Sequence, residues 1–200
     1  MLNQKIRGMW DDLMQPVGRA VARSGIGPDV ITVAGLLLQA LVAYLIIEGR
    51  LLAAGVVAVA AALSDALDGA VAKSRNGVSP LGALLDSTVD RLSDALFFAP
   101  VAWLYGVSPD PTRTDQRWVA AVALVALVSS FLVSYIKARA EGLGYDCNVG
   151  IVERAERLIL MIIGLLLNVV PAILVILATL SCITVVQRLL HVRTQVRSAV

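Results

Sequence analysis

Long stretches without a charged residue dominate this sequence and limit the folds that it can adopt. The runs Val30 to Ile47 and Val119 to Ile136 carry no charge at all. A helix needs about 20 apolar residues, with a range of about 17–25, to cross the hydrocarbon core of a bilayer. The chain is 58% hydrophobic and 16% charged, whereas soluble domains are about 45–50% apolar and about 25% charged. Lipid is therefore the predicted solvent for most of the chain.

Three further apolar runs bring the expected number of transmembrane helices to six. The runs Leu51 to Ala72 and Leu81 to Tyr105 are long enough but are interrupted by aspartates. The last run, Leu158 to Gln187, has 30 uncharged residues, which as one helix would be about 45 Å long and too long for one span. Asn168 and Pro171 fall near its middle and predict two helices joined by a tight turn. The expected fold is an all-α integral membrane protein.

The basic residues predict the orientation. Six spans put both termini and the loops near residues 73–80 and 137–157 on one side, which collects thirteen Lys and Arg residues against three on the other. The thirteen are Lys5, Arg7, Arg19, Arg23, Lys73, Arg75, Lys137, Arg139, Arg154, Arg157, Arg188, Arg193 and Arg197. By the positive-inside rule, both termini are expected on the cytoplasmic side of the cell membrane. Before the first span, residues 1–27 alternate apolar and basic residues at helical spacing, which predicts an amphipathic helix in the interface ahead of a transmembrane domain of residues 28–200.

Four aspartates in the second and third spans are the strongest chemical signal. Asp65 and Asp68 are three residues apart, and Asp86 and Asp90 are four apart, so each pair shares one helix face. The two spans are consecutive and antiparallel, with both pairs near their cytoplasmic ends, so the four carboxylates can converge. Carboxylates are costly in a membrane and suit hard cations such as Mg²⁺ or Mn²⁺. The alternative is helix capping or a solvated loop; Asp94, one turn beyond Asp90, suits a structural hydrogen-bonding role.

The spacing of these aspartates resembles a known signature. Asp65-x-x-Asp68-Gly69-x-x-Ala72-Lys73, eight residues, and Gly82-x-x-x-Asp86-x-x-x-Asp90 is similar to the motif of the CDP-alcohol phosphotransferase family, which also has six spans after an interfacial helix. The family usually has arginine where Lys73 stands. Lysine still binds phosphate as a point charge but lacks the planar fork of arginine.

The resemblance implies transfer of a phosphatidyl group from CDP-diacylglycerol to an alcohol, with release of CMP. It implies that Asp65, Asp68 and Asp86 bind two metal ions, Mg²⁺ with Mn²⁺ as an alternative, and that Asp90 shares this site and deprotonates the attacking hydroxyl. The nucleotide part of the lipid would contact Asp29, Thr32, Asp65, Gly69, Lys73 and Ser79. For Asp29 and Thr32 the alternative is helix capping. A homodimer among membrane lipids is also implied.

Basic residues at the ends of the later spans indicate which acceptor the enzyme uses. The strings Ser134 to Glu141 and Glu153 to Arg157 closely resemble the actinobacterial phosphatidylinositol phosphate synthases, which use inositol phosphate. The resemblance implies an acceptor phosphate pocket of Ser134, Lys137, Arg139, Arg154, Arg157 and Arg188. Arginine suits phosphate, but these residues could instead be topological flanks or contacts for anionic lipid.

Three other functions fit the sequence less well. A phosphatidylglycerol phosphate synthase would use glycerol 3-phosphate, which is also anionic. A divalent-cation transporter would need internal repeats or interrupted helices in matching halves, and the sequence shows neither. A purely structural membrane protein would not concentrate carboxylates in this way. No nucleic-acid partner is expected.

Overall fold

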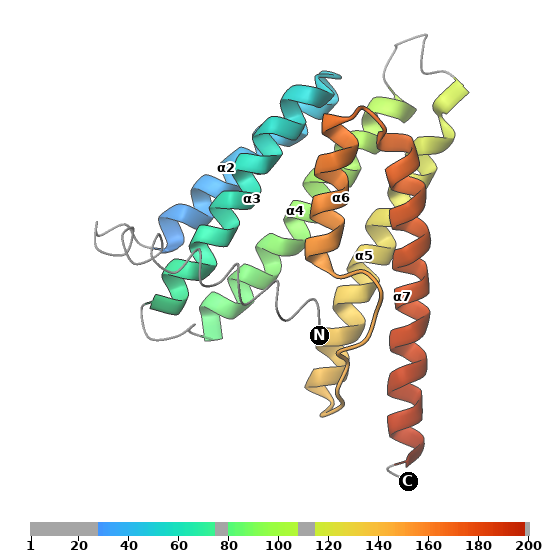
Figure 1. Ribbon diagram of the computed structural model, residues 1–200. Coiled ribbons are helices and arrows are strands. Elements are labelled where there is room, and N and C mark those ends of the chain that lie inside the picture. The colour runs from blue at the N-terminus through green and yellow to red at the C-terminus, as the bar shows by residue number, and fades with distance from the viewer. Residues whose placement is uncertain (1–27, 75–79, 108–114, 199–200) are drawn as a thin grey trace.

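The computed structural model describes residues 28–74, 80–107 and 115–198, and six α-helices make up most of this part (Figure 1). In chain order they are α2 (Pro28–Ile47), α3 (Leu51–Ser74), α4 (Pro80–Gly106), α5 (Trp118–Gly142), α6 (Arg154–Leu166) and α7 (Val170–Ser198). Each corresponds to one of the six helices predicted from the apolar runs. The predicted helix of residues 1–27 lies outside the described residues.

The break in the last apolar run is confirmed. The backbone N–H of Leu167 donates to the carbonyl of Ile163 over 2.9 Å, and Asn168 then takes a left-handed conformation with φ of 55°, which asparagine tolerates better than most residues. The chain reverses there and α7 begins at Val170. Helix α7 then continues to Ser198, beyond the apolar run, because its polar and basic end contains no helix-breaking residue.

Consecutive helices run in opposite directions. Figure 1 shows that α2, α4 and α6 begin, and α3, α5 and α7 end, toward the lower side of the molecule. Helices α2 and α3 form an antiparallel pair and α5 and α7 form a parallel pair, while α4 contacts α2 and α5, and α6 contacts α3 and α7 (Figure 1). The two central helices therefore join the outer pairs, and they carry Asp86, Asp90 and Arg154 toward the lower side.

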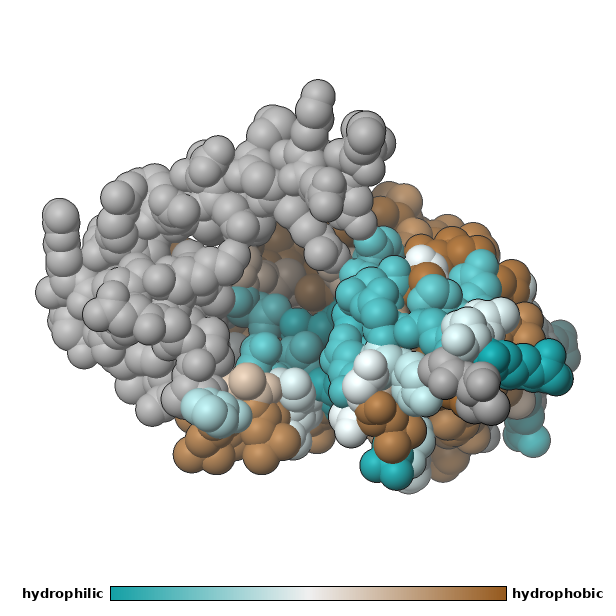
Figure 2. Space-filling view, turned by 90° about the horizontal axis from the view of Figure 1, so that it is seen from below, coloured by the Kyte–Doolittle hydropathy of each residue, from teal (hydrophilic) through white to brown (hydrophobic). Residues whose placement is uncertain are grey.

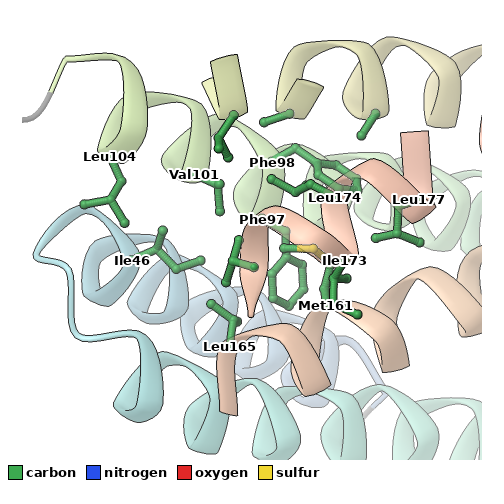
Figure 3. Close-up of a cluster of buried hydrophobic side chains, with 14 of the residues drawn as sticks. Ile46, Phe97, Phe98, Val101, Leu104, Met161, Leu165, Ile173, Leu174 and Leu177 are labelled. Atoms are coloured by element: carbon green, nitrogen blue, oxygen red, sulfur yellow. The ribbon is translucent and has the colours of Figure 1, made fainter. Parts of the chain in front are cut away.

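A cluster of apolar side chains fills the centre of the bundle. In Figure 3, Phe97 of α4 lies beside Met161 and Leu165 of α6 and near Leu174 of α7. These four side chains are at most 3% exposed. Gly55 allows α3 to approach α6 closely, because a Cβ atom there would lie 2.8 Å from the Leu166 side chain. This packing fixes the position of the lower ends of α4 and α6.

The outward-facing surface is also apolar. Leu37, Leu52, Val128 and Val186, from four different helices, are all more than 50% exposed. Soluble monomers rarely expose contiguous apolar areas of this kind, and lipid accounts for them. In the described chain, α5 and α7 are long and apolar enough to cross a membrane, while the apolar parts of α2 and α3, Ile31–Ile47 and Leu51–Leu67, are shorter. Helix α6 has only 13 residues, which is about 20 Å of helix.

Candidate active site

A pocket opens between α2, α3, α4 and α6. Its lining includes two of the predicted aspartates and an arginine that pairs with one of them. Asp65 of α3, Asp86 of α4 and Arg154 of α6 line it together with Thr32 of α2. Figure 2 views the molecule from the lower side, where hydrophilic residues gather around a hollow and hydrophobic ones lie toward the edges. The structure thus brings residues from four helices to one polar hollow.

Two aspartates meet at one guanidinium group. Nη1 of Arg154 lies 3.0 Å from Oδ2 of Asp65 and 2.9 Å from Oδ1 of Asp90. The hydrogen bonds of the guanidinium go to Asp65, through Nη1 at 3.0 Å and Nη2 at 3.4 Å. Oδ1 of Asp90 is buried and has no aligned hydrogen bond within the described residues. Asp65 and Asp90 therefore share one cation, which leaves this group of three side chains with a net negative charge.

Arg154 owes its position to the start of α6. The backbone N–H of Glu153 donates to Oε2 of Glu156 over 3.0 Å, which is one half of a capping box. The cap fixes where the helix begins, and Arg154 is its first residue. Its side chain is 27% exposed, so it can reach both the carboxylates and a solvated ligand.

A second ion pair lies deeper, on the same two helices. Nη2 of Arg157 lies 2.7 Å from Oδ2 of Asp94, with side chains 3% and 12% exposed. Asp94 follows Asp90 by four residues and Arg157 follows Arg154 by three, so the two pairs are stacked between α4 and α6. Asp94 has the structural hydrogen-bonding role expected from the sequence. Arg157 does not line the pocket in this structure.

Arg188 of α7 is also buried, and it holds the loop between α5 and α6. Its Nη1 donates to the carbonyl of Val133 over 2.6 Å and its Nε to the carbonyl of Val149 over 2.8 Å. The hydroxyl of Thr184, one turn earlier, accepts from the backbone N–H groups of Ile151 and Val152 at 3.2 and 3.3 Å. Sequence reasoning missed Thr184, although a threonine one turn before a predicted site arginine was a usable signal.

The remaining predicted acceptor residues lie on the last turns of α5. Nζ of Lys137 donates to Oδ1 of Asn148 over 2.9 Å, in the same loop. Ser134 is half-buried and follows Val133, the residue that Arg188 contacts. Arg139 is exposed and lies two positions from Lys137, so the two side chains leave the helix in different directions.

Several predicted nucleotide contacts cannot be placed in the same detail. Asp29 lies in α2, and Asp68, Gly69 and Lys73 lie in α3, but their side chains are outside the described part of the structure. Ser79 lies outside the described residues altogether. Thr32 lines the pocket, and its contact with the nucleotide stays a prediction.

The pocket suits a hard divalent cation by its chemistry. Within the described residues, no three Asp, Glu, His or Cys side chains form a ligand cluster. The side chain of Asp68 lies outside the described part of the structure. The buried Oδ1 of Asp90 without a hydrogen bond is an oxygen of the kind that Mg²⁺ and Mn²⁺ prefer. Asp65 and Asp90 share a single guanidinium, so a negative charge remains that a divalent cation would balance.

The family model described as CDP-alcohol phosphatidyltransferase matches residues 26–187. The phosphatidylinositol phosphate synthase of Mycolicibacterium smegmatis is 36% identical, over 94% of this chain and 87% of that protein.

Two solved structures of the Mycobacterium tuberculosis phosphatidylinositol phosphate synthase share the fold. The structure with CDP-DAG bound has a TM-score of 0.80 and 35% identity and covers 90% of this chain and 94% of that chain. The complex with manganese and citrate has a TM-score of 0.79 and 36% identity, over 90% and 89%. Such similarity along nearly the whole chain identifies a helical membrane protein, a transferase of phospholipid biosynthesis, that belongs to the CDP-alcohol phosphatidyltransferase family.

Proposed function

We propose that this enzyme transfers the phosphatidyl group of CDP-diacylglycerol to inositol phosphate, forming phosphatidylinositol phosphate and CMP. One observation carries the proposal: Arg154, a cation suited to phosphate, lines the pocket together with Asp65 and Asp86 and contacts the carboxylates of Asp65 and Asp90. A phosphorylated acceptor needs a positive group beside the base that activates it. The matched M. tuberculosis structure with CDP-DAG bound supports the choice of donor.

The aspartates would hold the donor and begin the reaction. Asp65, Asp68, Asp86 and Asp90 would bind two Mg²⁺ or Mn²⁺ ions, and the manganese in the relative supports this metal class. When bound, these ions neutralise the pyrophosphate and the leaving CMP. Asp29, Thr32, Gly69, Lys73 and Ser79 would contact the nucleotide.

Asp90 would then act as the base. It takes the proton of the acceptor hydroxyl, whose oxygen forms a bond to the phosphorus that carries the diacylglycerol. The bond from that phosphorus to the bridging oxygen breaks, and CMP leaves with the electron pair. The buried Oδ1 of Asp90, which lacks a hydrogen bond within the described residues, supports this role because a base must offer a free lone pair.

The acceptor would bind between the start of α6 and the last turns of α5, two helices that both contact α7. Arg154 is the first residue of α6, and Arg188 of α7 contacts both Val133, next to Ser134, and the loop that leads into α6. Ser134, Lys137 and Arg139 would complete the pocket. Arg157 and Arg188 would contribute positive potential from inside the protein, because both are at most 3% exposed.

The orientation and the assembly belong to the same proposal. The excess of Lys and Arg on the side of the aspartates supports an active site and termini facing the cytoplasm. A homodimer is proposed from the resemblance to the family.

An acceptor panel tests this function. Purified protein in detergent with CDP-diacylglycerol and Mg²⁺ is given inositol phosphate, free inositol or glycerol 3-phosphate, and CMP release is measured. Inositol phosphate should give the highest kcat/KM. Faster release with glycerol 3-phosphate would assign the acceptor to the alternative reaction instead, and no metal-dependent CMP release with any acceptor would refute the transferase proposal.

A further inference from the structure

The active-site pocket continues from the aspartates into the bundle. Ile31, Thr32, Asp65, Asp86 and Arg154 line its lower end. Farther along each helix the lining changes to Leu36 and Gln39 of α2, Ala61 of α3, Ser93 of α4 and Leu158 of α6. Seven residues separate Thr32 from Gln39 and Asp86 from Ser93, which corresponds to about 10 Å of helical rise on both walls.

The inner end of the pocket contains a buried amide oxygen without a hydrogen bond within the described residues. Gln39 is 6% exposed, and its Oε1 has no hydrogen bond within the described residues. Ser93, on the opposite wall, is 5% exposed. A buried amide without a hydrogen bond costs about 1–3 kcal/mol, and water is scarce at this depth in a membrane protein. Rotation of the amide by 180° lets Gln39 present either its oxygen or its NH₂ group to the pocket.

The lining at the inner end of the pocket does not suit a divalent cation or a phosphate, the ligands expected at the lower end. Divalent cations take several oxygen ligands that include carboxylates, and the inner lining offers an amide and a hydroxyl among alkyl side chains. A phosphate would need a cation, and Arg154 lies at the lower end. With the amide of Gln39 rotated so that its NH₂ group faces the pocket, this lining suits a neutral acceptor of hydrogen bonds that is attached to an apolar group.

We propose that Gln39, assisted by Ser93, donates a hydrogen bond to an ester carbonyl of the glycerol backbone of CDP-diacylglycerol and so selects ester-linked lipid donors. The inference rests on the proposed function, since it takes the same donor. In that lipid the ester groups are only a few bonds from the phosphate, which would sit at the aspartates. The alkyl wall of Leu36, Ala61 and Leu158 matches the first carbons of the acyl chains.

Two donors that differ only in these carbonyls test the inference. Dissociation constants are measured for CDP-diacylglycerol and for its diether analogue, which lacks both carbonyl oxygens, with purified protein in detergent and Mn²⁺. The wild type should bind the diester more tightly. Gln39→Leu should weaken binding of the diester by about three- to tenfold, the loss of one neutral hydrogen bond, and leave the diether unchanged. Ser93→Ala should show the same pattern to a smaller extent, and it serves if Gln39→Leu does not fold.

Gln187→Leu is the matched control, because Gln187 also has a buried Oε1 without a hydrogen bond in the described chain but does not line this pocket. The ratio of the two dissociation constants should stay as in the wild type. An equal effect of Gln39→Leu and Ser93→Ala on both lipids, or none, would overturn the inference. Binding is measured without an acceptor, so a wild type that prefers the diester but releases no CMP would refute the proposed reaction and support the role of Gln39.

Discussion

Oδ1 of Asp90 lies 2.9 Å from Nη1 of Arg154, the same nitrogen that donates to Asp65. A side chain of the chain itself thus supplies the positive charge that these carboxylates need. A divalent cation that binds Asp65 and Asp90 would compete with this guanidinium, because each carboxylate oxygen has a limited number of lone pairs. Arg154 would then be free to turn toward an acceptor phosphate.

Arg154→Gln is therefore expected to have opposite effects on metal binding and on turnover. Mn²⁺ affinity, measured from the electron paramagnetic resonance signal of the free ion, should rise by about three- to tenfold, a modest gain because Asp65 is 39% exposed and screened by solvent. Turnover with inositol phosphate should fall. Lys137→Gln removes a cation that contacts Asn148 instead, and should leave Mn²⁺ affinity as it is. Weaker Mn²⁺ binding by Arg154→Gln would contradict the competition.

Asp90→Asn separates the base from the donor site. The amide keeps the shape of the carboxylate but cannot accept a proton, so turnover should be lost while binding of CDP-diacylglycerol is nearly retained. Asp68→Asn should weaken metal and donor binding together. Titration of donor binding by fluorescence and measurement of CMP release on both variants check this. Turnover of Asp90→Asn close to that of the wild type would show that another group is the base.

The sequence predicts the helices well because their boundaries depend on local patterns. The five apolar runs, with the last one divided at Asn168, correspond to α2 to α7, and the break at Asn168 is correct. The convergence of Asp65 with Asp90 could also be anticipated, since it follows from two antiparallel helices. The pairing of Arg157 with Asp94 could not be anticipated. Arg157 follows Arg154 by three residues, so it lies about 4.5 Å deeper along α6, at the level of Asp94. Which groups meet there depends on how α6 packs, and Gln39 and Thr184 escaped notice for the same reason.

The proposed orientation can be checked with cysteines at the two ends of α5. Gln116 precedes the helix, Glu141 lies in its last turn, and both are exposed. In a background with Cys147→Ala and Cys182→Ala, Gln116→Cys should react with a membrane-impermeant maleimide added to intact cells, and Glu141→Cys should react only after lysis. The reverse labelling would place the aspartates on the outer side.

The two arginines of α6, which the sequence placed in one pocket, should differ in what their removal changes. Arg154 lines the pocket and is 27% exposed, whereas Arg157 is buried against Asp94. Removal of one member of a buried ion pair costs about 3–5 kcal/mol, because the other charge stays buried without a partner. Arg157→Ala should therefore lower the thermal stability strongly. Arg154→Ala should change it little and lower kcat/KM for inositol phosphate, by roughly ten- to a hundredfold if one charged hydrogen bond of about 1.5–3 kcal/mol is lost.

A double variant distinguishes lost stability from lost recognition. Arg157→Leu with Asp94→Leu removes both charges and fills the space with alkyl groups, so it should recover most of the stability that Arg157→Ala loses. If Arg157 acts only through this pair, the double variant should also recover most of the acceptor kinetics, measured as kcat/KM for inositol phosphate at a fixed concentration of CDP-diacylglycerol. A double variant as stable as the wild type that still needs far more inositol phosphate would show that Arg157 acts on the acceptor beyond its pair with Asp94.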